Sequence, residues 1–207
     1  LTAVIRSGGY VVKNASVRIV PKQNGQEIRY SVSDENVRTA GGIPVFGLYP
    51  DWLNTVEVEY DRVFNGKTEH FSDRYQLYAA PVFLRSNGTP GQTHTTFNVK
   101  VLKMDPAFKD RLYFINNLIP TPPDASRVVW NNPMGGALEW AFGPENAIVD
   151  STGTVRWYLN PDVEMYDPDQ PYKAGIMMGF EQTADGGLLF GYGQRYAKYD
   201  MTGREIF

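Results

Sequence analysis

Histidine and cysteine, which often serve as catalytic nucleophiles, bases and metal ligands, are scarce in this sequence. It contains two histidines, His70 and His94, and no cysteine. Neither histidine has a second histidine or an Asp-His spacing beside it, whereas a zinc site or a Ser-His-Asp triad needs several such groups together. We therefore expect both histidines to be ordinary surface residues. We also expect residues 1–207 to contain no metal ligand and no cofactor site.

Two other groups of residues have an obvious chemical interpretation. Four acidic residues would suit calcium, which prefers six to eight oxygen ligands: Asp162, Glu164, Asp167 and Asp169. They lack the Asp-x-Asp-x-Asp-Gly spacing and are interrupted by Pro161 and Pro168, so a solvated loop is the better interpretation. The glycines between positions 175 and 193 lack a following helix that could bind a phosphate, and turns between strands explain them better.

An internal repeat gives the first indication of the secondary structure that would position a site. The stretch Ala147–Gly153 recurs as Ala197–Gly203, fifty residues later. Both copies indicate a strand, a tight turn with glycine at positive φ, and a second strand. A period near fifty with short strands is typical of a β-propeller, which closes with roughly four to eight blades. Because residues 146–207 supply little more than one blade, we expect the chain to be the front part of a larger protein.

The first eighty residues instead predict a β-sandwich. Val56, Val58 and Tyr60 alternate with two glutamates, as in a strand with one buried face. Asn65-Gly66 then marks a tight turn into a second strand over residues 68–77. We expect about seven strands in a fibronectin-III/Ig-like sandwich. The all-β prediction thus divides into a sandwich (1–80), a linker with irregular strands (81–145) and a truncated propeller (146–207).

Composition excludes several partners. The net charge of −3 lacks the basic surface expected for nucleic-acid binding. No apolar run approaches the roughly 20 residues of a membrane span. The hydrophobic content of 42% is ample for a folded core.

Several stretches together resemble the bacterial arylsulfate sulfotransferases. They occur in order along the chain and are 1–5, Gly-Ile-Pro-Val-Phe-Gly-Leu-Tyr at 42–49, Phe-Lys-Asp-Arg-Leu-Tyr at 108–113, 148–150 with 156–159, and 178–180. The resemblance implies an N-terminal β-sandwich followed by a six-bladed propeller. It also implies a periplasmic homodimer that moves a sulfuryl group from a phenolic sulfate ester to a phenol. The implied route is ping-pong, through a covalently sulfated histidine and without a nucleotide donor.

By the family's pattern, the catalytic histidines follow beyond Phe207, so this chain alone is expected to be inactive. The resemblance carries over two aromatic residues of the phenol pocket, Tyr75 and Trp140. Simple packing is the alternative role for both. A third pocket tyrosine of the family falls at Ile176 here, and this departure leaves the acceptor preference open.

Two further interpretations remain open from the sequence. The Asp-Ser-Thr-Gly stretch followed by Trp157 is not far from the repeats of quinoprotein dehydrogenases, which have eight blades and a bound quinone. A sandwich and propeller that only recruit a partner or a carbohydrate would need no catalytic centre at all.

Overall fold

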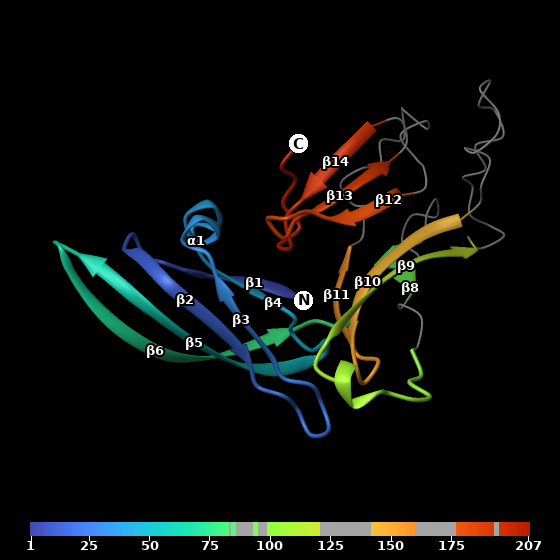
Figure 1. Cartoon of the computed structure of the whole chain (residues 1–207), viewed down its shortest axis with the longest axis horizontal. Coiled ribbons are helices and arrows are strands. Elements are labelled where there is room, and N and C mark those ends of the chain that lie inside the picture. Colours follow the sequence, from blue (N-terminus) through green and yellow to red (C-terminus); the bar gives the residue numbers. More distant parts are fainter. Residues whose placement is uncertain (83, 86–92, 95–98, 121–141, 160–176, 193–194) are drawn as a thin grey trace. The chain divides into compact units, whose positions relative to one another are not determined.

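The computed structural model describes residues 1–82, 84–85, 93–94, 99–120, 142–159, 177–192 and 195–207. These residues are mostly β-strand, which confirms the all-β prediction (Figure 1). The chain separates into two compact units. The first combines Leu1–Pro81 with Val99–Tyr113 and Ile148–Trp157, and the second contains Val82–Asn98, Phe114–Ala147 and Tyr158–Phe207.

The main sheet of the first unit has four antiparallel strands in the order β3-β2-β5-β6. Their bounds are β2 Val11–Ile19, β3 Ile28–Val32, β5 Trp52–Phe64 and β6 Lys67–Ala79. The strands β5 and β6 pair along their whole lengths, from Trp52 opposite Ala79 to Phe64 opposite Lys67. Asn65 and Gly66 join them with φ of 48° and 74°, and two positive φ values are what a type I′ hairpin turn requires.

A second layer covers part of this sheet. It contains a ribbon of β1 (Thr2–Arg6) and β4 (Gly42–Phe46), paired antiparallel. The short helix α1 (Asp34–Ala40) packs against β2 and β4. Its first turn is capped by the Ser33 hydroxyl, which accepts from the Asn36 amide, and it ends at Gly41 in the left-handed conformation. The expected seven strands over this region are therefore six strands and one helix.

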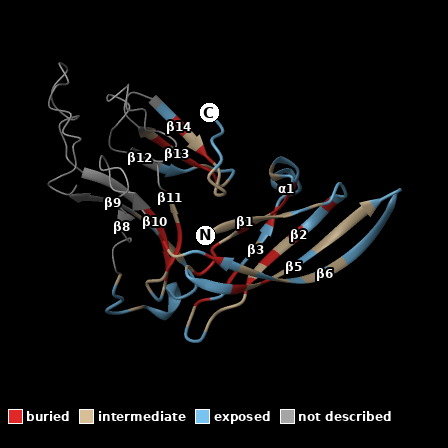
Figure 2. Ribbon diagram, turned by 180° about the vertical axis from the view of Figure 1, so that it is seen from behind, coloured by how far each residue is buried: buried red, intermediate tan, exposed pale blue. Residues whose placement is uncertain are grey.

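The hydrophobic core lies between these layers. It draws its fully buried side chains from β2, β4 and β5, including Val17, Ile19, Val45, Val56 and Val58. The glutamates that alternate with Val56 and Val58 lie toward solvent, as the sequence predicts. Figure 2 shows buried residues on β2 and exposed residues along much of β6.

The first unit also contains residues from beyond position 98. Val99–Tyr113 includes a short 3-10 helix, Pro106–Phe108, and the start of β9 (Leu112–Pro120). Ile148–Trp157 includes the end of β10 (Phe142–Asp150), a turn, and the start of β11 (Val155–Leu159). The three strands form a sheet in the order β11-β10-β9.

The second unit contains short antiparallel sheets. One pairs β7 (Leu84–Arg85) with β8 (Thr93–His94). Another contains β12 (Met177–Gln182), β13 (Leu188–Tyr192) and β14 (Arg195–Tyr199) in sequence order. Residues after β14 turn back onto it, because Tyr199 bridges Glu205 and the Ile206 amide donates to the Lys198 carbonyl at 2.7 Å. No closed barrel is present among the described residues, and the six-bladed propeller stays a prediction.

Candidate functional site

The two copies of the repeated stretch form turns of the same geometry. Oδ1 of Asp150 accepts from the Thr152 amide and hydroxyl and from the Thr154 amide, at 2.6–3.1 Å. Fifty residues later, Oδ1 of Asp200 accepts from the Thr202 amide at 2.9 Å and from the Arg204 amide at 3.1 Å. The glycine of each turn has φ of 84° or 87°, where an L side chain is strained. The repeat seen in the sequence is therefore a repeat in structure.

The first copy differs from the second in what its aspartate binds. Oδ2 of Asp150 accepts from Nη1 of Arg156 at 2.7 Å, and both side chains are 0% exposed. In the second copy Asp200 pairs with Arg204 at 3.0 Å, and these side chains are 27% and 48% exposed. The position equivalent to Arg156 in the second copy is Ile206. Among the residues that the structure describes, only the first turn thus binds a buried cation.

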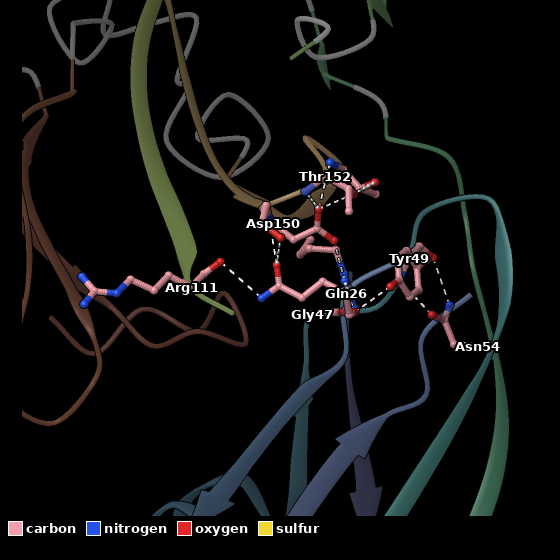
Figure 3. Close-up of polar contacts among 10 residues, drawn as sticks. Gln26, Gly47, Tyr49, Asn54, Arg111, Asp150 and Thr152 are labelled. Carbon is pink, nitrogen blue, oxygen red and sulfur yellow. Dashed lines mark hydrogen bonds and ion pairs between the residues drawn. The ribbon is translucent and has the colours of Figure 1, made fainter. Parts of the chain in front are cut away.

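Arg156 binds main-chain groups of the N-terminal layers. Its Nε donates to the Gly47 carbonyl at 2.9 Å, and its Nη1 donates to the Gln26 carbonyl at 3.0 Å. Its guanidinium carbon lies 3.6 Å from the ring centroid of Tyr49, a close cation–π contact. Three elements distant in sequence therefore share one guanidinium. Figure 3 shows Gln26, Gly47 and Asp150 lying close together around this point.

Gln26 completes the connection through its side chain. Its Oε1 accepts from the Ser151 amide and hydroxyl, both at 2.8 Å, and its Nε2 donates to the Arg111 carbonyl at 3.2 Å. Gln26 is only 8% exposed. These bonds therefore replace the hydrogen bonds to water that its side-chain amide loses on burial. Position 201, equivalent to Ser151, is methionine, which has no side-chain hydroxyl to donate.

Tyr49 is held in place from two sides. Its hydroxyl donates to the Gln26 carbonyl at 2.7 Å, and its backbone N–H donates to Oδ1 of Asn54 at 2.8 Å. The Asn54 amide returns a bond to the Tyr49 carbonyl at 3.0 Å. Burial raises the pKa of the Tyr49 hydroxyl, against a smaller opposing effect of Arg156, so the group stays a donor at neutral pH.

We call Gln26, Gly47, Tyr49, Asp150 and Arg156 the junction cluster. It is fully buried or nearly so, and its one cation faces one anion. It contains no histidine, serine–base pair or exposed polar group that could attack a substrate. Its arrangement suits fixing the first repeated turn to the N-terminal layers rather than catalysis.

Neither histidine belongs to this cluster. His70 is in β6, and its Nδ1 lies 2.9 Å from Oδ1 of Asp61, its cross-strand partner in β5. The sequence spacing did not predict this pair, because the register of the β5–β6 hairpin, and not proximity along the chain, places Asp61 beside His70. The His70 side chain is 65% exposed, which fits the expected surface position. His94 lies in β8, where only its backbone pairing with Leu84 is described.

Tyr75 lies on the face of β6 that packs against the N-terminal core. Oδ2 of Asp73 accepts from the Tyr60 hydroxyl at 2.9 Å and lies 3.5 Å from the Tyr75 hydroxyl. Burial, and then the Asp73 carboxylate, raise the pKa of Tyr75 above its ordinary value. Both roles weighed for Tyr75, packing and substrate contact, are compatible with this position.

The neighbouring Tyr60 gives a pH-dependent signal that tests this local structure. Burial and the Asp73 carboxylate raise its pKa from 10.0 to about 12. Between pH 10 and about pH 12, the Tyr60 hydroxyl therefore keeps its proton in the native state and loses it in the unfolded state. The resulting contribution to stability is complete below pH 10 and is lost as the pH rises through about 12. We expect Asp73→Asn to lower the Tyr60 pKa toward 10, measured by tyrosinate absorbance.

Tyr60→Phe is the reference that isolates this signal from the other tyrosines. The spectrum of Tyr60→Phe subtracted from that of the parent protein gives the titration of Tyr60 itself. An unchanged midpoint in Asp73→Asn would show that the carboxylate does not act on this hydroxyl.

Several residues considered from the sequence lie outside the described residues. These are Trp140, Ile176, and the acidic group Asp162, Glu164, Asp167 and Asp169. Within the described part of the chain, no group of three or more His, Cys, Asp or Glu side chains could hold a metal ion. The described helices are also too short and polar to cross a membrane.

The comparisons with known proteins agree in order and extent with the resemblance seen in the sequence. A model of the arylsulfotransferase Ig-like domain matches residues 1–80, and an arylsulfotransferase (ASST) model matches residues 98–207. The arylsulfate sulfotransferase AssT of Lelliottia amnigena is 31% identical over 222 aligned positions. AssT of Escherichia coli O6:H1 (strain CFT073) is 30% identical over the same length. All of this chain is covered, but it spans only 36% of the length of each relative.

Proposed function

Because this chain belongs to the arylsulfotransferase family, we propose that it is the N-terminal part of an aryl sulfotransferase. The enzyme would move a sulfuryl group from a phenolic sulfate ester to a phenol, without a nucleotide donor. The observation that carries the proposal is the match of two consecutive models of one family, in the same order as the sandwich and repeat regions. No described residue favours the quinoprotein or binding-module alternatives.

The proposed reaction proceeds in two displacements. A histidine nitrogen outside residues 1–207 attacks the sulfur of the donor, the sulfur–oxygen bond to the aryl group breaks, and the phenolate leaves and takes up a proton. The acceptor phenol then attacks the same sulfur, loses its proton, and breaks the nitrogen–sulfur bond. A covalent intermediate of this kind divides one difficult transfer into two easier ones.

Within this enzyme, the described residues would have a positioning role. The junction cluster would hold the first repeated turn against the N-terminal layers, so that the catalytic region starts from a fixed point. Tyr75 and Trp140 would contribute aromatic surface to the phenol pocket. We further propose that the enzyme is a periplasmic homodimer, as the family resemblance implies.

Turnover by the full-length protein tests this proposal. Incubation with an aryl sulfate ester and a phenol should release the donor phenol and form the sulfated acceptor in equal amounts. The 207-residue chain alone should form neither. Full-length protein without turnover on a panel of aryl sulfates, or turnover by this chain alone, would contradict the proposal.

A tyrosine pair on one strand tests the pocket role in the same assay. Tyr75→Ala should raise KM for the phenolic substrate roughly threefold to tenfold, the range expected for the loss of one aromatic stacking contact. Tyr78→Ala is the matched control, because Tyr78 is 63% exposed on the opposite face of β6. Equal effects of the two variants would leave Tyr75 a packing residue.

A further inference from the structure

The strand β6 is an open sheet edge within the described part of the chain. It lies at the end of the order β3-β2-β5-β6 and runs for 13 residues, Lys67–Ala79. Its register with β5 has no bulge, and it contains no proline. Natural sheets normally shorten, twist, interrupt or place charges on such an edge, because its unpaired N–H and C=O groups invite another strand. The strand β6 is neither short nor interrupted, and the charges that it carries are of both signs. The opposite edge, β3, is only five residues long and leads into α1.

The half of β6 nearest the hairpin turn is exposed on both faces. Lys67, Glu69 and Phe71 point to one face, and Thr68 and His70 point to the other. All of these except Phe71 are exposed, and Phe71 is partly exposed. This half of the strand thus contributes little to the hydrophobic core.

We propose that β6 pairs with β6 of a second copy of this protein, antiparallel, about a two-fold axis that passes through His70. In this register Lys67 lies directly opposite Asp73 of the second copy, and the symmetry makes this pair twice. Directly opposed charges of opposite sign favour pairing of strands, and like charges oppose it. The ladder covers residues 67–73 on each strand.

Several other two-fold registers of the same edge are disfavoured by charge, and registers centred on Ser72, Tyr75 or Gln76 form no directly opposed pair of opposite charges. An axis through Glu69, Asp73 or Arg74 places that residue opposite its own copy. An axis through Phe71 places Glu69 opposite Asp73. An axis through Thr68 places Lys67 opposite Glu69. The ladder would then contain only residues 67–69 of each strand, because β6 begins at Lys67.

The two charged partners are available for this contact. Lys67 is exposed and forms no ion pair or hydrogen bond with the described residues. Its neighbour on the same face, Glu69, is already paired with Arg62 at 2.9 Å. Asp73 receives both tyrosine hydroxyls at Oδ2, which leaves Oδ1 without a partner in the described part of the chain.

This inference names a surface for the homodimer proposed above, but its test is separable from that proposal. A dimer that forms through another surface would overturn only the inference, and a monomer would overturn both. A seven-residue ladder buries less area than a typical stable interface, so we expect a weak dimer unless other contacts add to it.

Single cysteines in the full-length protein test the register. In His70→Cys the two Cα atoms should lie about 5 Å apart, within the range of a disulfide. In Thr68→Cys they should lie about 13 Å apart, too far for one. We expect mild oxidation to give a covalent dimer with His70→Cys at least tenfold more than with Thr68→Cys or the parent protein. Equal cross-linking of the two variants would overturn the register.

Charge reversal provides a second test that is independent of oxidation. Lys67→Asp and Asp73→Lys should each be monomeric alone, as measured by sedimentation. Mixed together they should form a heterodimer, because each opposed pair then contains one Asp and one Lys. If Asp73→Lys fails to fold, Lys67→Asp combined with His70→Cys should lose the cross-link. Single variants that dimerise like the parent, or a retained cross-link, would overturn the proposal.

Discussion

Replacing Arg156 with leucine is expected to lower the free energy of unfolding by about 3–5 kcal/mol. The substitution leaves the Asp150 carboxylate buried without its cation, and it removes donors from the Gly47 and Gln26 carbonyls. An uncompensated buried charge and an unpaired Gly47 carbonyl both carry a desolvation cost, whereas the Gln26 carbonyl keeps its bond from the Tyr49 hydroxyl. Urea unfolding, followed by tryptophan fluorescence and by circular dichroism, measures the change.

The repeat supplies the control for this variant. Arg204→Leu removes an arginine that pairs with the equivalent aspartate of the second turn, but that pair is partly exposed. Exposed ion pairs contribute about 0–1 kcal/mol, so this variant should stay close to the parent protein. Equal losses in the two variants would show that burial of the first pair has no special consequence.

Replacing Gly153 with alanine is expected to cost about 2–5 kcal/mol, from two separate causes. Gly153 has φ of 84°, which costs a side chain about 1–2 kcal/mol. An added Cβ would also lie 2.6 Å from the Val99 carbonyl oxygen, a backbone atom that cannot swing aside. Forced overpacking of this kind adds about 1–3 kcal/mol.

Gly203→Ala separates the two causes. Gly203 has the same positive φ, at 87°, but an added Cβ there meets nothing within 4 Å. We expect it to show only the conformational cost of about 1–2 kcal/mol. The difference between the variants, measured by urea unfolding, isolates the contact between the first turn and the segment at Val99. No difference between them would argue that this contact is loose.

Much of the fold could be predicted from local patterns. Alternation of Val56 and Val58 with charged residues identifies β5, because a half-buried strand repeats every two residues. Asn65-Gly66 identifies the hairpin turn, since both residues tolerate positive φ. The repeated Asp-x-Thr-Gly stretch predicts two equivalent turns, which the hydrogen bonds of Asp150 and Asp200 confirm.

The helix α1 was missed although its signals are present. Ser33 precedes two acidic residues, and Gly41 follows the last turn, which are normal start and stop signals for a helix. At seven residues the element is too short to show helical periodicity. Capping residues alone were the only signal that could have identified it.

The junction cluster could not be predicted from the sequence. In a strand such as β11, an arginine between apolar neighbours would normally be assigned to the solvent face. Two of Arg156's acceptors are main-chain carbonyls more than 100 positions away, and a carbonyl leaves no mark on its residue type. The one available signal is a difference between the repeats, since the second copy has Ile206 at this position.

Native-state amide hydrogen exchange tests most directly whether the first repeated turn is built into the N-terminal unit. The amides of Asp150 and Asp200 donate bonds of the same length, 2.9 Å, to equivalent carbonyls of the two turns. We predict that the Asp150 amide opens with the same free energy as the amides of Val17 and Val58, whereas the Asp200 amide opens more easily. In Arg156→Leu the two aspartate amides should exchange alike. Equal protection of both in the parent protein would contradict the account.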